Sequence, residues 1–229
     1  MSDLSPILQS LPQYVHGAWV TVQLLLASVA CGLAMALPLA WLRSLPSRWA
    51  SWPVWAFTYV LRGTPLLVQV FLMYYGLAQF DAVRASVLWP WLSSAWFCAI
   101  AAFALNTCAY TTEILHGAIR AIPAGEIEAA KALGMSRAVT FRRIVLPAAF
   151  RRALPAYGNE VVLMLQATSL ASIVTIADLT SAAREFNSAY YLPFEAFITA
   201  ALFYMVLNFL LVGAFRAAER RWLLPTLPR

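Results

Sequence analysis

The stretch YVHGAWVTVQLLLASVACGLAMALPLAWL, residues Tyr14–Leu42, contains no Asp, Glu, Lys or Arg. A run of about 20 apolar residues is long enough to cross a bilayer as a helix. The whole chain has the same character, because 62% of its 229 residues are hydrophobic and 11% are charged. A soluble domain averages roughly a quarter charged residues. The sequence therefore predicts an all-α integral membrane protein.

Four more apolar blocks follow the first, so we predict five transmembrane helices. Trp and Tyr residues crowd the borders of the blocks, as expected at the depth of lipid headgroups. The connections leave no place for a domain boundary, and we predict one transmembrane domain over residues 1–229. The predicted spans are residues 14–42, 54–80, 94–116, 156–176 and 194–215.

The basic residues gather in alternate connections, with only Arg84 and Arg184 on the opposite side. The majority group consists of Arg43, Arg48, Arg62, Arg120, Lys131, Arg137, Arg142, Arg143, Arg151, Arg152, Arg216, Arg220, Arg221 and Arg229. Basic loops face the cytoplasm, which predicts an outer N-terminus and a cytoplasmic C-terminus. The first basic residue comes after the first span, so we expect that span to be retained. Charges between spans also argue against nucleic acid as a partner, despite the net charge of +6.

Residue types that carry catalytic chemistry do not converge in this sequence. The three cysteines, Cys31, Cys98 and Cys108, lie inside apolar segments without a CxxC pair, which indicates packing residues. The one lysine, Lys131, stands between alanines, whereas a phosphate-binding loop ends in Gly-Lys-Ser/Thr. No catalytic triad or metal cluster is visible. Energy for any active process must come from another subunit.

The longest polar connection, residues 117–152, is predicted to hold two short helices. Pro123 suits a helix start, Gly134 a helix stop and Ser136 the cap of a second helix, which Pro147 is expected to end. Such a pair of helices at the membrane surface can dock a soluble partner. It can equally lie on lipid, and periodicity alone leaves both interpretations open.

A signature within this connection resembles the EAA loop of permeases from bacterial ABC importers. In that family the loop seats in a groove of the ATP-binding subunit and carries its movement to the membrane helices. The resemblance implies a coupling role for the seven matched positions. These are Glu128, Ala129, Ala130, Gly134, Ile144, Leu146 and Pro147.

Other segments are similar to polar amino-acid permeases, and the similarity extends over nearly the whole chain. Residues 62–69 and 106–113 match that family generally. Residues 159–168 and 216–222 are most similar to the M-type subunit of histidine/lysine/arginine/ornithine permeases and their arginine and opine relatives. One departure concerns Gln166 and Ala167, where many relatives carry Lys-Asp, and it puts in doubt any role of those charges here.

The resemblance implies a permease subunit that imports polar amino acids across the bacterial inner membrane by alternating access, with the basic ones (histidine, arginine, lysine and ornithine) as the expected substrates. It also implies an ATPase dimer, which would carry the ATP and Mg, a periplasmic substrate-binding protein and contact with membrane lipid. No cofactor is expected on this chain itself. The second permease is expected to be a Q-type sister or another copy. Glutamine or an opine as solute, and a non-transporting scaffold, remain alternatives.

Polar groups within the spans are candidates for the substrate pathway, since they are costly in a membrane and often functional. Such groups can also hold helices together, and this is the interpretation we favour for Glu113, paired with Arg120. Arg62, beside Gly63-Thr64-Pro65, is predicted to be structural, at a turn able to break its span. The candidate pathway residues are Asn106, Tyr110, Asn159, Glu160, Gln166 and Thr168.

Overall fold

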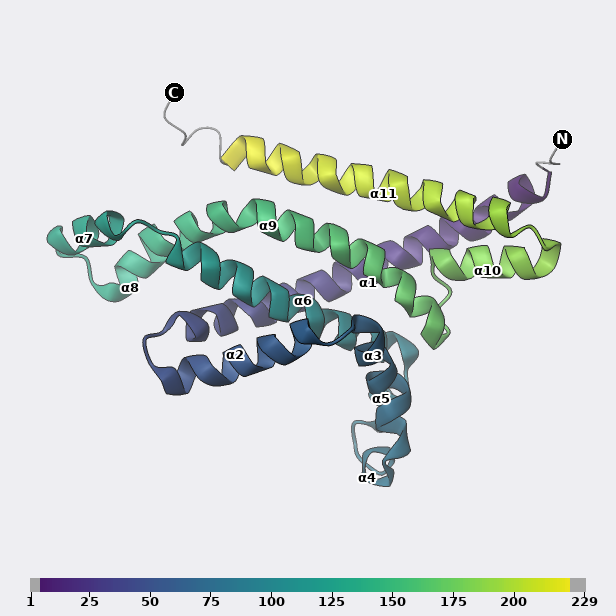
Figure 1. Cartoon of the computed structure of the whole chain (residues 1–229), viewed down its shortest axis with the longest axis horizontal. Coiled ribbons are helices and arrows are strands. Elements are labelled where there is room, and N and C mark those ends of the chain that lie inside the picture. Colours follow the sequence, from purple (N-terminus) through teal and green to yellow (C-terminus); the bar gives the residue numbers. More distant parts are fainter. Residues whose placement is uncertain (1–4, 223–229) are drawn as a thin grey trace.

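The computed structural model describes residues 5–222, and every regular element within them is a helix (Figure 1). Arg229, which was counted among the cytoplasmic charges, lies outside these residues. The elements are α1 (Ser5–Ser44), α2 (Arg48–Gly63), α3 (Leu66–Phe71), η1 (Leu72–Gly76), η2 (Leu77–Gln79), α4 (Asp81–Arg84), α5 (Trp89–Leu92), α6 (Ala95–Arg120), α7 (Ala124–Ala132), α8 (Arg137–Thr140), η3 (Phe141–Val145), α9 (Leu146–Ala167), η4 (Thr168–Val174), α10 (Leu179–Tyr190) and α11 (Pro193–Trp222).

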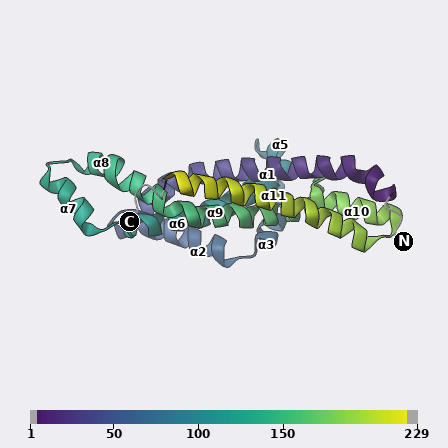
Figure 2. The same ribbon diagram turned by 90° about the horizontal axis from the view of Figure 1, so that it is seen from above.

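The long helices α1, α6, α9 and α11 run along the long axis of the molecule (Figure 1). The short helices α7 and α8 lie at one end of this bundle, and α10 lies at the other end with the start of α1. The view from above gives the same arrangement (Figure 2). The predicted all-α membrane fold is confirmed.

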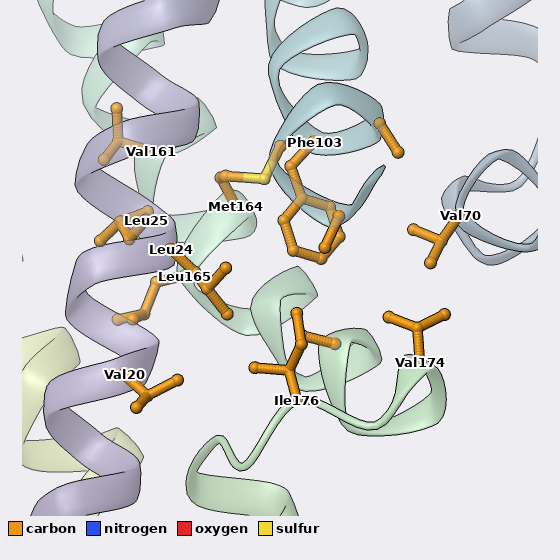
Figure 3. Close-up of a cluster of buried hydrophobic side chains, with 13 residues drawn as sticks. Val20, Leu24, Leu25, Val70, Phe103, Val161, Met164, Leu165, Val174 and Ile176 are labelled. Carbon is orange, nitrogen blue, oxygen red and sulfur yellow. The ribbon is translucent and has the colours of Figure 1, made fainter. Parts of the chain in front are cut away.

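Helices α1 and α6 approach closely because small residues face each other. A Cβ added at Gly32 would lie 2.3 Å from the Thr107 methyl group and 3.0 Å from the Ala104 carbonyl oxygen. Small residues allow such contact in membranes, where the apolar solvent supplies little hydrophobic drive between helices. The main hydrophobic core lies beside this contact and includes Leu24 and Phe103, both with 0% exposure (Figure 3).

Three helices are individually long and apolar enough to span a membrane: α1, α6 and α11. They contain the predicted first, third and fifth spans, within one residue at the start of the third. Two bent pairs meet the same test only when each pair is taken together. The chain therefore has five spans only if each bent pair crosses the membrane once.

The predicted second span, residues 54–80, is wrong as one continuous helix. The chain bends by 102° between α2 and the segment Leu66–Gln79, at the Thr64-Pro65 turn that was expected to be able to break it. Gln69 bridges the break, because its Nε2 donates to Leu61 O at 2.7 Å and to Thr64 O at 3.1 Å. The backbone carbonyls freed by the bend are thus satisfied inside the protein, as a membrane requires.

Helix α9 begins at Leu146, ten residues before the predicted fourth span, residues 156–176. Pro147 does not end a helix. It lies in the first turn of α9, where the missing N–H of proline costs nothing, and the π-helical η3 joins α8 to it. At the other end the chain continues as η4, then bends by 50° into α10.

Candidate functional site: a coupling segment and a polar cavity

The coupling segment, which we define as residues 122–147, forms a hairpin of α7 and α8 at one end of the bundle (Figures 1 and 2). Gly134 has φ +73°, a left-handed conformation that glycine adopts without strain. Met135 N donates to Ala130 O at 3.1 Å, and Gly134 N donates to Lys131 O at 2.9 Å, the double pattern of a Schellman helix end. Ser136 caps α8 by accepting from Val139 N. The predicted turn and cap are confirmed.

One face of the coupling segment is anchored to the membrane helices. Ile122 and Val145 are buried in a cluster with Leu115 on α6 and Ala149 on α9. Arg152 reinforces this anchor from α9, because it donates to Ala121 O at 3.2 Å and forms an ion pair of 3.3 Å with the Glu126 carboxylate. The coupling segment is therefore packed and ion-paired against the adjoining ends of α6 and α9.

The other face of the coupling segment is open. Glu128, Ala129, Gly134 and Pro147 are exposed, Ile144 and Leu146 are half-buried, and Ala130 is buried. Leu133 at the tip is 81% exposed. A large apolar side chain on the outermost turn favours contact with another surface.

A cavity of about 170 Å³ lies between α3, α6 and α9. It brings together Asn106, Tyr110 and Glu160, three of the six predicted pathway residues. The remaining lining residues are Leu66, Leu163, Met164 and Ala167. Glu160 is 6% exposed, and among residues 5–222 no basic nitrogen lies within 4.0 Å of its carboxylate.

The cavity lies deep in the bundle. At 1.5 Å per residue, Asn106 is about 21 Å from the end of α6 and Glu160 about 21 Å from the start of α9. Both groups are thus about four helical turns from the ends that adjoin the coupling segment. A buried carboxylate in a membrane-spanning bundle suits a cationic group.

The other three predicted residues do not line this cavity. Asn159 and Gln166 are exposed on α9, and Asn159 instead borders a separate groove against α11 that includes Phe215. Thr168 is fully buried and donates to Leu165 O at 2.6 Å within its own chain segment. Within this chain, Asn159 and Gln166 on α9 and Thr168 on η4 thus lie apart from the cavity, and their place in a substrate pathway stays a prediction.

Gln69 is a residue of this region that the sequence did not single out. Asn106 Nδ2 donates to Gln69 Oε1 at 3.2 Å, while Gln69 itself bridges the break after α2. The cavity wall and the break are thereby one hydrogen-bonded unit. The position of Gln69 four residues after Pro65, on the first turn beyond the break, was the available signal.

Arg62 does not lie beside Arg43 and Arg48, with which the charge pattern grouped it. It stands 14 positions after Arg48 on α2, which is about 21 Å of helix, so it lies at the opposite end of α2 from Arg48. Its guanidinium carbon lies 5.2 Å from the centroid of the Tyr110 ring. Arg62 therefore does not line the cavity but contacts Tyr110, which does.

Glu113 holds helices together, as expected, but its predicted partner is wrong. Its carboxylate accepts from Arg43 Nε at 3.1 Å and from Thr58 Oγ1 at 2.7 Å. These partners come from α1 and α2, and among residues 5–222 no ion pair joins Glu113 to Arg120. The seven-residue spacing puts Glu113 and Arg120 on one face of α6, but Arg43 on the neighbouring α1 lies closer to the Glu113 carboxylate.

Neither the coupling segment nor the cavity has the donors of a metal centre. Within the described part of the chain, no three His, Cys, Asp or Glu side chains are close enough to hold a metal ion together. The cysteines in this range are all free, and Cys98 and Cys108 are buried.

The chain is similar in sequence to known membrane transport proteins. Residues 28–223 match the family described as binding-protein-dependent transport system inner membrane component. The nopaline transport system permease protein NocM of Agrobacterium fabrum is 45% identical over 97% of this chain and 92% of its own. The histidine/lysine/arginine/ornithine permease protein HisM of Salmonella typhimurium is 48% identical over 90% of this chain and 88% of its own.

Solved structures share the architecture. A crystal structure of an amino acid ABC transporter with histidines superposes with a TM-score of 0.86 and 32% identity, over 96% of this chain and 99% of that one. An inward-facing methionine ABC transporter, MetNI, gives 0.76 at 19% identity, over 96% of this chain and 99% of that one. The second likeness concerns the fold alone.

Proposed function

Because the chain belongs to the family of binding-protein-dependent transport system inner membrane components, we propose that it imports basic amino acids as one membrane-spanning half of an ABC importer. The permeases similar to it that are named above serve histidine, lysine, arginine and ornithine, or nopaline. Glutamine or another polar solute is the alternative. The single observation that carries our choice is the buried Glu160 carboxylate in the cavity between α3, α6 and α9.

Glu160 is proposed to bind the ammonium or guanidinium group of the substrate. A carboxylate shielded from water interacts strongly with a cation, and charge-assisted hydrogen bonds are about twice as strong as neutral ones. Asn106 and Tyr110 supply an amide and a phenol on the facing helix, α6. A neutral side chain such as that of glutamine would leave the carboxylate without its charge partner.

The coupling segment is proposed to dock an ATPase dimer in the cytoplasm, and with five spans the N-terminus is proposed to lie outside. ATP binding closes the dimer and draws the coupling segments of two permeases together. The burial of Ile122 and Val145 against α6 and α9 supports transmission of that movement to the cavity walls. A Q-type sister permease or a second copy completes the membrane part, and a periplasmic binding protein delivers the substrate. Transport is directional because the two states differ in affinity for the substrate.

The experiment is uptake of labelled arginine by proteoliposomes that contain the full complex and its binding protein. Glu160→Gln is expected to reduce uptake at least about tenfold, since a charged hydrogen bond is worth about 1.5–3 kcal/mol. Glu185→Gln is the matched control, because Glu185 lies on α10 away from the cavity. Lysine and histidine should compete with arginine. Absence of competition by both, or full uptake by the Glu160→Gln complex, would exclude basic amino acids bound at Glu160.

Docking is tested separately by co-purification of the ATPase. Glu128→Lys or Gly134→Asp is expected to weaken ATPase recovery and to abolish uptake. A non-transporting scaffold would be indicated if a tagged chain recovered no ATPase and both variants left uptake unchanged.

A further inference from the structure

Arg62 carries a charge that the coupling and packing roles do not use. It is exposed on the penultimate residue of α2, two positions before the Thr64-Pro65 break. Charged groups within membrane-spanning segments are costly and face a bundle interior or a polar path. Structural arginines are paired, yet no carboxylate oxygen among residues 5–222 lies within 4.0 Å of Arg62.

The guanidinium is held over an aromatic ring, and its N–H groups donate to no acceptor within residues 5–222. Its carbon lies 5.2 Å from the Tyr110 ring centroid, which is within the range of a cation–π contact. Tyr110 also donates from its hydroxyl to Arg62 O at 3.5 Å. Stacking fixes the plane of the guanidinium while leaving the N–H groups along its edge for an anion.

The backbone at Arg62 is tied to the cavity. Leu61 O, one residue earlier, accepts from Gln69 at 2.7 Å and from Asn106 at 3.4 Å. Leu66, one turn later, lines the cavity together with Tyr110 and Glu160. Arg62 is therefore held at the rim of the cavity, with Tyr110 contributing both to the cavity wall and to the Arg62 contact.

We infer that Arg62 binds the α-carboxylate of the amino acid whose cationic group occupies Glu160. This inference rests on the proposed function and adds the second charged contact of the same site. Arginine recognises carboxylates with two parallel N–H donors, and a fixed cation–anion pair across Tyr110 suits a solute that carries both charges. The site would then reject basic amines that lack a carboxylate.

The experiment measures equilibrium binding of labelled arginine to the purified complex of permeases and ATPase, without the binding protein. Unlabelled arginine and agmatine, its decarboxylated analogue, compete for the site. The wild-type complex is expected to prefer arginine by about tenfold or more, the usual worth of a charged hydrogen bond. Arg62→Gln should reduce this preference to about twofold or less, and Arg62→Lys, which keeps the charge, should retain part of it.

The outcomes separate the two proposals. If the wild-type complex binds arginine and Arg62→Gln keeps the full preference over agmatine, the role of Arg62 is overturned while Glu160 stands. If the wild-type complex binds neither ligand, the proposed substrate site itself fails. Co-purification of the sister permease is measured for both variants. Loss of that subunit with Arg62→Gln and unchanged ligand preference in Arg62→Lys would assign Arg62 to a carboxylate of the partner, against our inference.

Discussion

The contact between Glu113 and Arg43 connects three helices, and its removal gives a prediction that can be worked through in full. Arg43 Nε lies 3.1 Å from Glu113 Oε1, and the two side chains are 20% and 19% exposed. Thr58 on α2 donates to the same carboxylate oxygen at 2.7 Å, and Arg43 also donates to Ser51 Oγ at 2.7 Å. Loss of Glu113 leaves a largely shielded guanidinium without its anion.

The expected cost follows from that shielding. Breaking a fully buried pair costs about 3–5 kcal/mol, whereas an exposed pair contributes about 0–1 kcal/mol. At about one-fifth exposure we expect Glu113→Ala to lower the free energy of unfolding by about 2–3 kcal/mol. Glu113→Gln keeps an acceptor for Thr58 but loses the charge, and about 1–2 kcal/mol is expected.

A double-mutant cycle isolates the pair. Glu113→Ala, Arg43→Ala and the double variant are unfolded reversibly in mixed micelles, and the coupling free energy is expected to be about 2 kcal/mol. The matched control is the cycle on Glu126 and Arg152, a more exposed pair at 3.3 Å, for which less than about 1 kcal/mol is expected. A Glu113–Arg43 coupling below about 0.5 kcal/mol, or no larger than that of the control, would refute the argument from burial.

Three further predictions concern packing and turns. Gly32→Val should lower the free energy of unfolding by about 2–3 kcal/mol, because its Cβ would lie 2.3 Å from a methyl group of α6. At Gly117 an added Cβ meets no atom within 4 Å, so Gly117→Val should lower the free energy of unfolding far less in the same assay. Gly134→Ala should lower the free energy of unfolding by about 1–2 kcal/mol, because the φ of +73° at this position is left-handed, and it should also weaken co-purification of the ATPase. Gly125→Ala, where an added Cβ also meets open space, should leave co-purification unchanged. Gln69→Leu removes the donors that bridge the break after α2. Uptake should therefore fall, and the free energy of unfolding should fall by about 2 kcal/mol. Unchanged uptake would mean that the break holds its shape without Gln69.

The sequence predicted well those features that depend on a few neighbouring residues. Gly134 marked a helix end because the left-handed conformation is open to glycine, and Ser136 marked a helix start because its hydroxyl can accept from a free N–H. Pro147 was ambiguous by the same local rules, since proline stops a preceding helix and also suits the first turn of the next. The structure has the second outcome, and helix α9 accordingly begins at Leu146.

Helix α10 could have been predicted from the sequence, although the helices predicted above do not include it. Asp178 caps it by accepting from Ser181 N at 2.9 Å. The residues Leu179, Ala182, Ala183 and Phe186 are buried at helical spacing. A capping aspartate before such a pattern predicts a short amphipathic helix, even in a segment too polar to be a span.

By itself, the sequence determined that this chain is an all-helical membrane protein, where its long apolar helices lie and where its coupling turn forms. Those properties depend on apolar length and on backbone preferences within one turn. The tertiary structure alone decided which polar groups meet: Asn106, Tyr110 and Glu160 in one cavity, with Asn159 on another face. The rotation of each helix is set by contacts such as that of Gly32 against α6. Spacing along one helix gives the face that residues share, but the neighbour of that face depends on how all the helices pack.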